Sequence, residues 1–312
     1  MDRLRVLAET HGFFSRQDAL AEGYDDNSIR RALKVKAWRR VRHGAYTFPD
    51  LWTDSDDVAR HKTRARAVLR RLGDRVALSH TSAAVMHGLT LWNVDLSMVH
   101  VTRLDGGAGR TEAGVVHHEG FLVHDDLVEV GGIRMTSMAR AAVETASLGP
   151  TEPGVVVLDS ALREGCGREA LEDAFAVMGH WPKVRGLQVA VPFADGRAES
   201  VGESRSRYLF YVYGLPAPEL QYEVRDEYGG LVGITDFAWP GHKLLGEFDG
   251  KVKYGRLLRP DEDPGDAVFR EKRREDQLRE VTGWSMVRLV WSDLYDGAGT
   301  AARVRRMMRS AA

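Results

Sequence analysis

The sequence predicts an α+β protein of several domains, and three observations lead to this class. The chain has 312 residues, which at roughly 100–200 residues per domain supports two or three hydrophobic cores. Its first part is patterned as short helices followed by a hairpin, and its last part as helix, three strands, helix and strand. Apolar residues make up 43% of the chain and charged residues 29%, which excludes a disordered or collagen-like chain.

Composition also indicates the cellular compartment in which the protein is expected. The single cysteine, Cys166, excludes an internal disulfide and a cysteine-based zinc site. The first ten residues, MDRLRVLAET, carry charges where a signal peptide needs an apolar run, and no stretch approaches 18 uninterrupted apolar residues. We therefore expect a cytoplasmic protein without a membrane segment. We expect three domains, at residues 1–52, 53–195 and 196–312.

The amino-terminal domain is predicted to be a winged helix. Three short helices are expected over residues 2–11, 15–23 and 26–37, since Gly12 and Gly23 provide stops. Their expected N-caps include Ser15 and either Asp26 or Asn27. The segment AWRRVRHGAYTF follows, and its His-Gly pair is a turn signal between two β-like runs. A hairpin here lies where a winged-helix domain has its wing.

Positive charge is concentrated in this predicted domain. Residues 28–42 contain seven cations and no acid, although the whole chain has a net charge of −1. A basic helix beside a basic wing would suit the phosphates of DNA. The alternative is an ordinary solvated helix face. The residues expected to bind DNA are Arg30, Arg31, Lys34, Arg39, Arg40 and Arg42.

These same residues carry a family resemblance. The pattern G.fsrqdAl..G.....irr.l....WrrVrhGaY resembles the amino-terminal winged helix of the abortive-infection type IV antitoxin family, AbiEi-like, over about the first fifty residues. The resemblance implies that this domain binds DNA.

The middle domain is predicted to be an α+β connector. Helices are expected at residues 54–73, 79–88 and 136–147, and short strands within residues 97–135. LSHTSAAVMHGL also resembles the continuation of the antitoxin family, which implies a regulatory role, and no catalytic residue is assigned here. Its histidines raise a metal hypothesis, but no HExxH pattern exists and the structural role is favoured. They are His80, His87, His100, His117, His118 and His124.

The carboxy-terminal domain has an informative order of elements. A helix at about residues 200–213 precedes β-runs at 219–225, 231–239 and 243–249, which strong turn signals separate. A charged helix at about 266–281 and a β-run at 285–291 complete the order.

Acidic residues in these β-runs indicate a metal-binding catalytic site. Asp236, Glu247 and Asp249 interrupt apolar strands, where a carboxylate must be paired, protonated or bound to a cation. Strand alternation would bring them to one side of neighbouring strands. Mg²⁺ prefers such oxygen ligands, with Mn²⁺ as a substitute, and Lys251 could reach the same pocket.

The carboxy-terminal segment resembles the PD-(D/E)XK nuclease superfamily, and more narrowly its Vsr-like branch, over about residues 199–296. The resemblance implies a restriction-endonuclease-like α/β core in which Glu203, Asp236 and Glu247 surround Mg²⁺. One departure is that Asp249 stands where the superfamily expects lysine, as in the E-x-D-G form of the Vsr-like branch. Lys251 is the closest substitute for that nucleophile-activating lysine.

These residues also have structural interpretations. Glu203 and Arg207, four apart on a helix, would form an ordinary surface ion pair, and Arg273, Arg274 and Arg279 would pair with glutamates of their own helix.

Two functions follow from the sequence. The main hypothesis is a Mg²⁺-dependent DNA endonuclease with a winged helix, acting in phage defence or DNA repair, in which Asp236, Glu247, Asp249, Lys251 and Glu203 are catalytic. The alternative is a DNA-binding transcriptional regulator, antitoxin-like, whose nuclease fold is inactive. RNA as the substrate and a homodimer as the assembly stay open.

Overall fold

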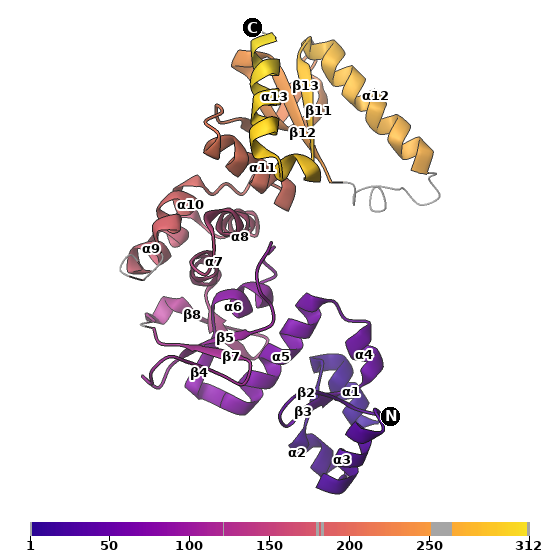
Figure 1. The fold of residues 1–312 in the computed structure, drawn as a ribbon, viewed down its shortest axis with the longest axis vertical. Helices are drawn as coiled ribbons and strands as arrows, with labels where there is room; N and C mark the ends of the chain where they lie inside the picture. The colour runs from indigo at the N-terminus through magenta and orange to yellow at the C-terminus, as the bar shows by residue number, and fades with distance from the viewer. Residues whose placement is uncertain (1, 121, 179–180, 182–183, 251–263, 311–312) are drawn as a thin grey trace. The chain divides into compact units, whose positions relative to one another are not determined.

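A computed structural model describes residues 2–120, 122–178, 181, 184–250 and 264–310 (Figure 1). The chain divides into two compact units, which are considered separately. The first contains residues 1–157 and 165–192, and the second contains residues 158–164 and 193–312. Helices and mixed sheets occur in the chain, which confirms the α+β class. None of the helices within the described residues is both long and apolar enough to cross a bilayer.

The first unit begins with three helices and a small sheet, as the sequence predicts. The sheet has the order β1-β3-β2, and β2 and β3 form the expected hairpin around Gly44, whose φ of 76° suits glycine. The elements are α1 (Arg3–His11), β1 (Phe14–Ser15), α2 (Arg16–Ala21), α3 (Asp26–Lys34), β2 (Arg39–Arg42) and β3 (Ala45–Thr47).

A small aromatic core holds this amino-terminal region together. Trp38 is buried between α3 and β2, and its ring lies 4.8 Å from those of Phe14 and Tyr24. Leu4 and Ile29 complete the buried side from the helices. The helices can therefore keep their charged residues on the outer side while the apolar stripe faces this core.

The rest of the first unit surrounds a six-stranded mixed sheet of order β6-β7-β5-β4-β9-β8. The predicted helix at residues 54–73 is α5, whose N-cap Asp56 accepts from the Ala59 N–H. The elements are α4 (Pro49–Thr53), α5 (Asp57–Leu72), β4 (Val76–Leu78), α6 (His80–Met86), β5 (Val99–Arg103), β6 (Arg110–Glu112), β7 (Val115–His118), β8 (Leu127–Val130), β9 (Ile133–Thr136), α7 (Met138–Ala146), α8 (Thr151–Arg163), α9 (Arg168–Met178) and α10 (Leu187–Phe193). The ends of α8 and α10 belong to the second unit.

The second unit has the expected order of helix, three strands, helix and strand. Its sheet runs β10-β11-β12-β13, and β12 pairs with β13 in parallel because α12 provides the long crossover that a parallel pair needs. The elements are α11 (Val201–Val212), β10 (Glu219–Arg225), β11 (Leu231–Trp239), β12 (Leu244–Asp249), α12 (Pro264–Thr282), β13 (Ser285–Val290) and α13 (Gly297–Ser310). Short 3₁₀ turns in the two units are Gly73–Arg75, His124–Asp126, Val184–Gly186, Pro240–His242 and Trp291–Leu294.

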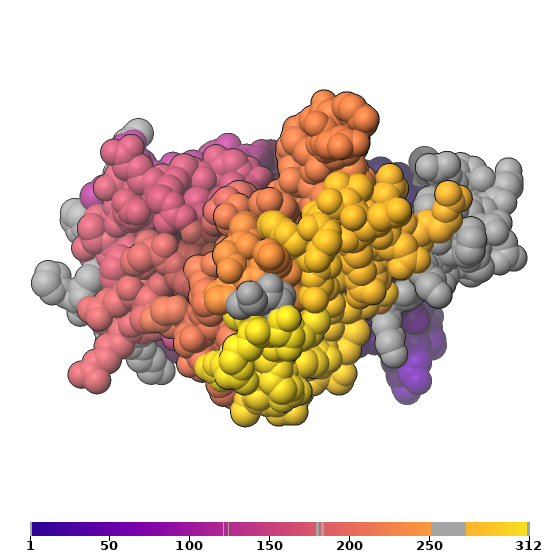
Figure 2. Space-filling model, turned by 90° about the horizontal axis from the view of Figure 1, so that it is seen from above, coloured from indigo at the N-terminus to yellow at the C-terminus, as the bar shows by residue number. Residues whose placement is uncertain are grey.

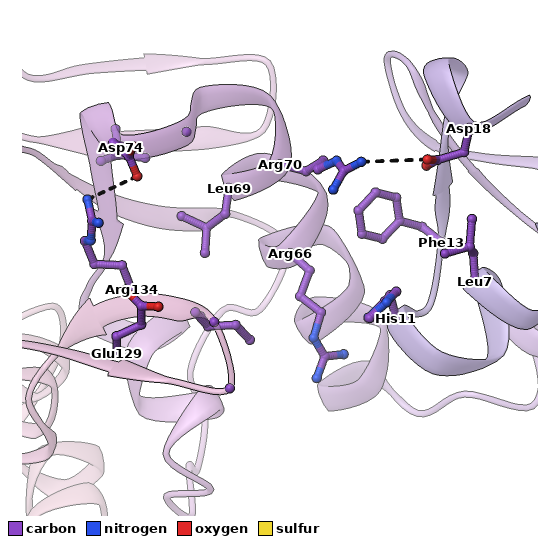
Figure 3. Close-up of a pocket in the computed structure, with 15 residues that line it drawn as sticks. Leu7, His11, Phe13, Asp18, Arg66, Leu69, Arg70, Asp74, Glu129 and Arg134 are labelled. Atoms are coloured by element: carbon purple, nitrogen blue, oxygen red, sulfur yellow. Dashed lines mark ion pairs between the residues drawn. The ribbon is translucent and has the colours of Figure 1, made fainter. Parts of the chain in front are cut away.

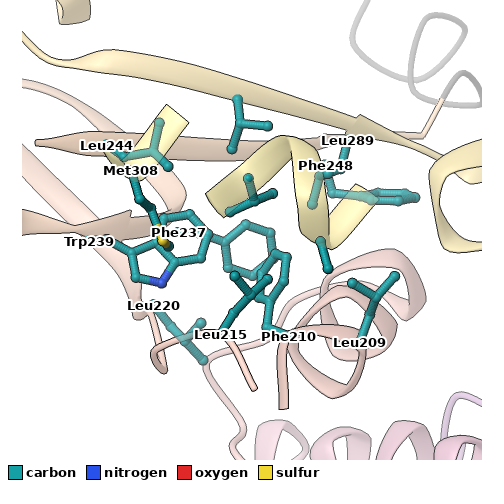
Figure 4. Packing of buried hydrophobic residues seen from close by; sticks show 13 residues of the cluster. Leu209, Phe210, Leu215, Leu220, Phe237, Trp239, Leu244, Phe248, Leu289 and Met308 are labelled. Carbon is teal, nitrogen blue, oxygen red and sulfur yellow. The ribbon is translucent and has the colours of Figure 1, made fainter. Parts of the chain in front are cut away.

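An apolar core fills one face of this second sheet (Figure 4). Phe237 and Trp239 of β11 pack edge-on against Phe210 of α11, with ring centroids 5.4 and 5.1 Å apart. Helix α13 adds Met308 to the same core and lies at the surface of the unit, where Figure 2 shows it in yellow. The acids of β11 and β12, Asp236, Glu247 and Asp249, therefore take the alternate strand positions, which point the other way.

Candidate functional site

The outer face of α3 carries the first group of predicted DNA-binding residues. The helix begins at Asp26 as predicted, but its N-cap is Asp25, whose side chain accepts from the Ser28 N–H at 2.7 Å, rather than Asp26 or Asn27. Ile29 is buried against the core, and this fixes the rotation of the helix. The three cations of the helix are consequently exposed to solvent: Arg30, Arg31 and Lys34.

The positive charge of this face is only partly neutralised. Arg30 donates to the Asn27 side chain at 2.6 Å, and the nearby Asp26 is paired with Arg16 at 2.7 Å. Within the described part of the chain, Arg31 and Lys34 have neither an ion-pair nor a side-chain hydrogen-bond partner. Their charges are therefore available to an external anion.

The wing adds a second basic surface. Arg39 and Arg40 on β2 are exposed, whereas Trp38 just before them is buried. Arg39 lies over the Trp52 ring at 5.2 Å, which leaves its guanidinium edge for other partners. A hollow of about 440 Å³ separates the end of α3 from this strand and is lined by Leu33, Lys36, Trp38, Arg39, Arg40 and Pro49.

Arg42 differs from the other predicted DNA-binding residues. Its side chain is half-buried, and its Nη1 atom is buried without a hydrogen-bond partner among the described residues. Burial and the neighbouring charge of Arg71 lower the pKa of Arg42. The structure thus places Arg42 beside α5, away from the exposed arginines of the wing. Strict alternation would put Arg40 and Arg42 on one face of β2, but the pairing of β2 with β3 shifts its register between these two residues, and the sequence alone does not reveal this shift.

A larger cavity of about 560 Å³ lies elsewhere in the same unit (Figure 3). Its walls come from α1, α2, α5 and the turn between β8 and β9. Two ion pairs border it, Arg70 with Asp18 at 3.7 Å and Arg134 with Asp74 at 3.3 Å. Four of its charged groups thus pair with one another, and we assign this cavity no function.

Three histidines from distant parts of the sequence meet beside the six-stranded sheet. His80 begins α6, His100 lies on β5 and His118 ends β7. The Nδ1 of His100 and the Nε2 of His118 are 2.8 Å apart, and the His80 and His118 rings stack at 3.6 Å. Among the described residues, this trio is the one group of histidine, cysteine or acidic side chains whose three ligand atoms all lie within 4.8 Å of one another.

Burial keeps these three rings neutral. Desolvation lowers the pKa of His100 to about 4 and that of His118 to about 3, with each lowered further by a neighbouring histidine. The pKa of the almost fully buried His80 is lowered well below its ordinary value for the same reason. All three imidazoles are therefore uncharged at neutral pH.

A buried ion-pair network borders the histidines. Arg140 donates to Glu144 at 2.9 Å and lies 3.3 Å from Asp126. Glu144 also accepts from the backbone N–H of His80 at 2.9 Å. Burial raises the pKa of Glu144, which Arg140 and these donors oppose. This network fixes α7 against the start of α6.

In the second unit, the predicted acids lie on one face of the sheet. Phe237 pairs with Gly246, so the next step of the antiparallel register places Asp236 opposite Glu247. Asp249 shares this face because it lies two residues beyond Glu247 on β12. Asp236 accepts from the Phe248 N–H at 2.7 Å.

Arginines supply the counter-charge for this acidic face. Arg274 of α12 donates to Glu247, and Arg288 of β13 lies 3.7 Å from Glu247 and 3.9 Å from Asp249. Arg279 pairs with Glu275 of its own helix, as predicted. Among the described residues, these acids do not bring three ligand atoms within 4.8 Å of one another, although Mg²⁺ can be held by one or two carboxylates together with water.

The remaining nuclease-like residues have other positions. Glu203 is the third residue of α11, where it accepts from Ser200 and from the Glu199 N–H at the helix start. Arg207 does not pair with Glu203 but donates to the buried Asp159 at 2.8 Å. Lys251 lies outside the described residues.

Comparisons with known proteins found matches to the amino-terminal region and to 75% of the chain. Residues 2–49 match the family model described as "Transcriptional regulator, AbiEi antitoxin". The chain is also 34% identical over 237 residues to uncharacterized protein Rv2248 of Mycobacterium tuberculosis strain H37Rv, covering 75% of this chain and 81% of that protein. MT2308 of strain CDC 1551 gives the same values. A crystal structure of RV2827C from the same species shares 18% identity and a TM-score of 0.37, over 55% of this chain and 70% of that one.

Proposed function

The chain belongs to the same protein family as Rv2248 of Mycobacterium tuberculosis, and we propose that it is a DNA-binding transcriptional regulator. The observation that carries this proposal is the pair of exposed basic surfaces on α3 and β2. The match of residues 2–49 to the AbiEi regulator family supports it, because the matched residues include the basic surfaces of α3 and β2.

The helix order supports a specific mode of contact. α2, a short turn and α3 follow one another as in a helix-turn-helix, in which the second helix enters the major groove. The amino-terminal residues of this second helix contact base edges in such proteins, and here Asn27 and Arg30 near the start of α3 are exposed. Arg31, Lys34 and Arg40 would contact phosphates on either side. The wing would then lie along the adjacent backbone.

Salt dependence tests this proposal. Replacing Arg31, Lys34 and Arg40 together by alanine removes about three phosphate contacts, so the slope of log affinity against log salt should become less steep by roughly 3. Fluorescence anisotropy of a labelled mixed-sequence duplex with the full chain measures this slope. The control replaces three exposed arginines elsewhere, Arg185, Arg306 and Arg309, and removes the same charge. Equal slopes for the two triple variants would reject the assigned surface.

We propose DNA hydrolysis as a second candidate function, with the second unit as a PD-(D/E)XK-like core that depends on Mg²⁺. The placement of Asp236 opposite Glu247 on neighbouring strands favours it, because this superfamily has acids at these two strand positions. The ion pairs that arginines form with Glu247 weigh against it, since Arg274 donates to the Glu247 carboxylate that would bind the metal ion. The regulator is therefore the preferred function.

Plasmid cleavage distinguishes the two functions. A nuclease should nick supercoiled plasmid in millimolar Mg²⁺ or Mn²⁺ and lose this activity with EDTA or in the variant D236A. The control E219A changes an exposed acid at the start of β10 and should cut like the wild type. An intact plasmid with the wild-type protein in both metals would leave the regulator as the function.

A further inference from the structure

The histidine trio is held by the backbone as well as by burial. His80 has a φ of 49°, a left-handed conformation that is strained for a residue with a side chain. It directly follows Ser79, the N-cap of α6, and its N–H is fixed by Glu144. Such strain is kept where the fold needs a side chain in one position. Here the position is the one that stacks His80 on His118.

The two strand histidines are brought together by the register of the sheet. β5 and β7 are parallel, with His100 opposite Val116 and Thr102 opposite His118. His100 and His118 therefore lie on one face, two positions apart, with their nitrogens directed at each other. When two neutral imidazoles hydrogen-bond, a protonated nitrogen of one ring donates to the unprotonated nitrogen of the other ring. A metal ion could replace that shared proton and bind both nitrogens.

Polar groups behind the histidines suit a metal site. Ser79 Oγ lies 3.0 Å and Glu144 Oε2 3.5 Å from the Nδ1 of His80, which leaves Nε2 to face an ion. The backbone N–H of His100 donates to Ser82 Oγ at 2.8 Å, and this oxygen lies 2.9 Å from Nε2 of His61, so this part of β5 is also held in place. These contacts fix the ligands much as outer-shell groups do in metalloproteins.

The local charge also favours a cation. Two buried carboxylates, Glu144 and Asp126, face a single guanidinium, that of Arg140. With both carboxylates ionised, the formal charges of these three side chains sum to one negative charge. His100 also lines a cavity of about 300 Å³ together with Asp95 and Thr145.

We propose that His80, His100 and His118 bind one divalent transition-metal ion of the Zn²⁺ class. Imidazole nitrogens suit Zn²⁺, Co²⁺ and Ni²⁺ but not Mg²⁺, so this site is chemically distinct from the acidic face of the second unit. Three protein ligands leave a fourth position for water. Because the His80 and His118 rings stack, binding requires them to turn their nitrogen edges toward a common point. The ion would join α6, β5 and β7.

Titration of the metal-free full chain tests the site. Calorimetry with Zn²⁺ should show one ion per chain at micromolar Kd or tighter, and a hundredfold excess of Mg²⁺ should not displace it. The variant H118N should weaken Zn²⁺ binding at least a hundredfold. The control H117N changes the neighbouring histidine on the opposite face of β7 and should bind like the wild type. Equal Zn²⁺ affinity in H118N and wild type, or absence of stoichiometric binding, would overturn the proposal.

A measurement on the unaltered protein removes any dependence on folding of the variants. X-ray absorption of the Zn²⁺-loaded wild-type chain should show three imidazole ligands, and the Co²⁺-loaded chain should show the visible absorption of a four-coordinate ion. Two or fewer imidazoles in the first shell would reject the trio as the site. This result is independent of DNA binding, so it does not depend on the proposed regulator.

Discussion

Replacing Arg140 by methionine should lower the free energy of unfolding of the first unit by about 3–5 kcal/mol. The side chain is only 1% exposed and serves two buried carboxylates, those of Glu144 and Asp126. Removing the guanidinium leaves Glu144 without a counter-charge, although it is fully buried. Scanning calorimetry should show an earlier transition for this unit and an unchanged one for the other.

The controls separate charge burial from simple loss of an arginine. R134M removes an exposed pair with Asp74, which should change stability by less than about 1 kcal/mol. The double variant R140M/E144Q should recover part of the loss, because it removes the uncompensated carboxylate as well. Equal losses for R134M and R140M would show that the network does not stabilise this unit.

Replacing Trp38 by alanine should lower the stability of the amino-terminal helices by about 3–5 kcal/mol and abolish DNA binding. Trp38 is 6% exposed, and its ring contacts those of Phe14, Tyr24 and Tyr46. Because it joins α3 to β2, its loss should separate the two basic surfaces. Hydrogen exchange of the amides in residues 3–47, with DNA binding of the full chain, measures both effects.

The conservative variant W38F is the matched control for this prediction. Phenylalanine retains an aromatic ring for the edge-on contact with Phe14, so most of the exchange protection and DNA affinity should remain. If W38A kept its amides protected and bound DNA with unchanged affinity, the aromatic core would not organise the binding surface.

Local signals in the sequence predicted the elements well because caps and turns act over a few residues. The Ser15 capping box, the glycine stops and the hairpin at Gly44 are all local features. The N-cap of α3 was predicted one or two residues late, since Asp25, Asp26 and Asn27 can each cap a helix and the sequence does not decide among them.

Contacts between distant segments explain what the sequence could not show. Alternation correctly placed Asp236 and Glu247 on one face, but nothing local indicated that Arg274 and Arg288 reach Glu247. For the histidines, the structure shows a cluster that the sequence did not predict. Their spacing matches no metal motif, and only the sheet register brings His100 beside His118. A concentration of histidines in β-like runs was the one signal available.

The ratio between specific and non-specific DNA affinity tests the regulator most directly. The full chain is used to select binding sites from a library of random duplexes, and the selected duplex is then compared with a scrambled duplex at one salt concentration. We expect at least a thousandfold preference for the selected sequence, which alanine at Asn27 and Arg30 should reduce. A ratio near one, or a preference unaffected by these substitutions in α3, would contradict a regulator that reads DNA through this helix.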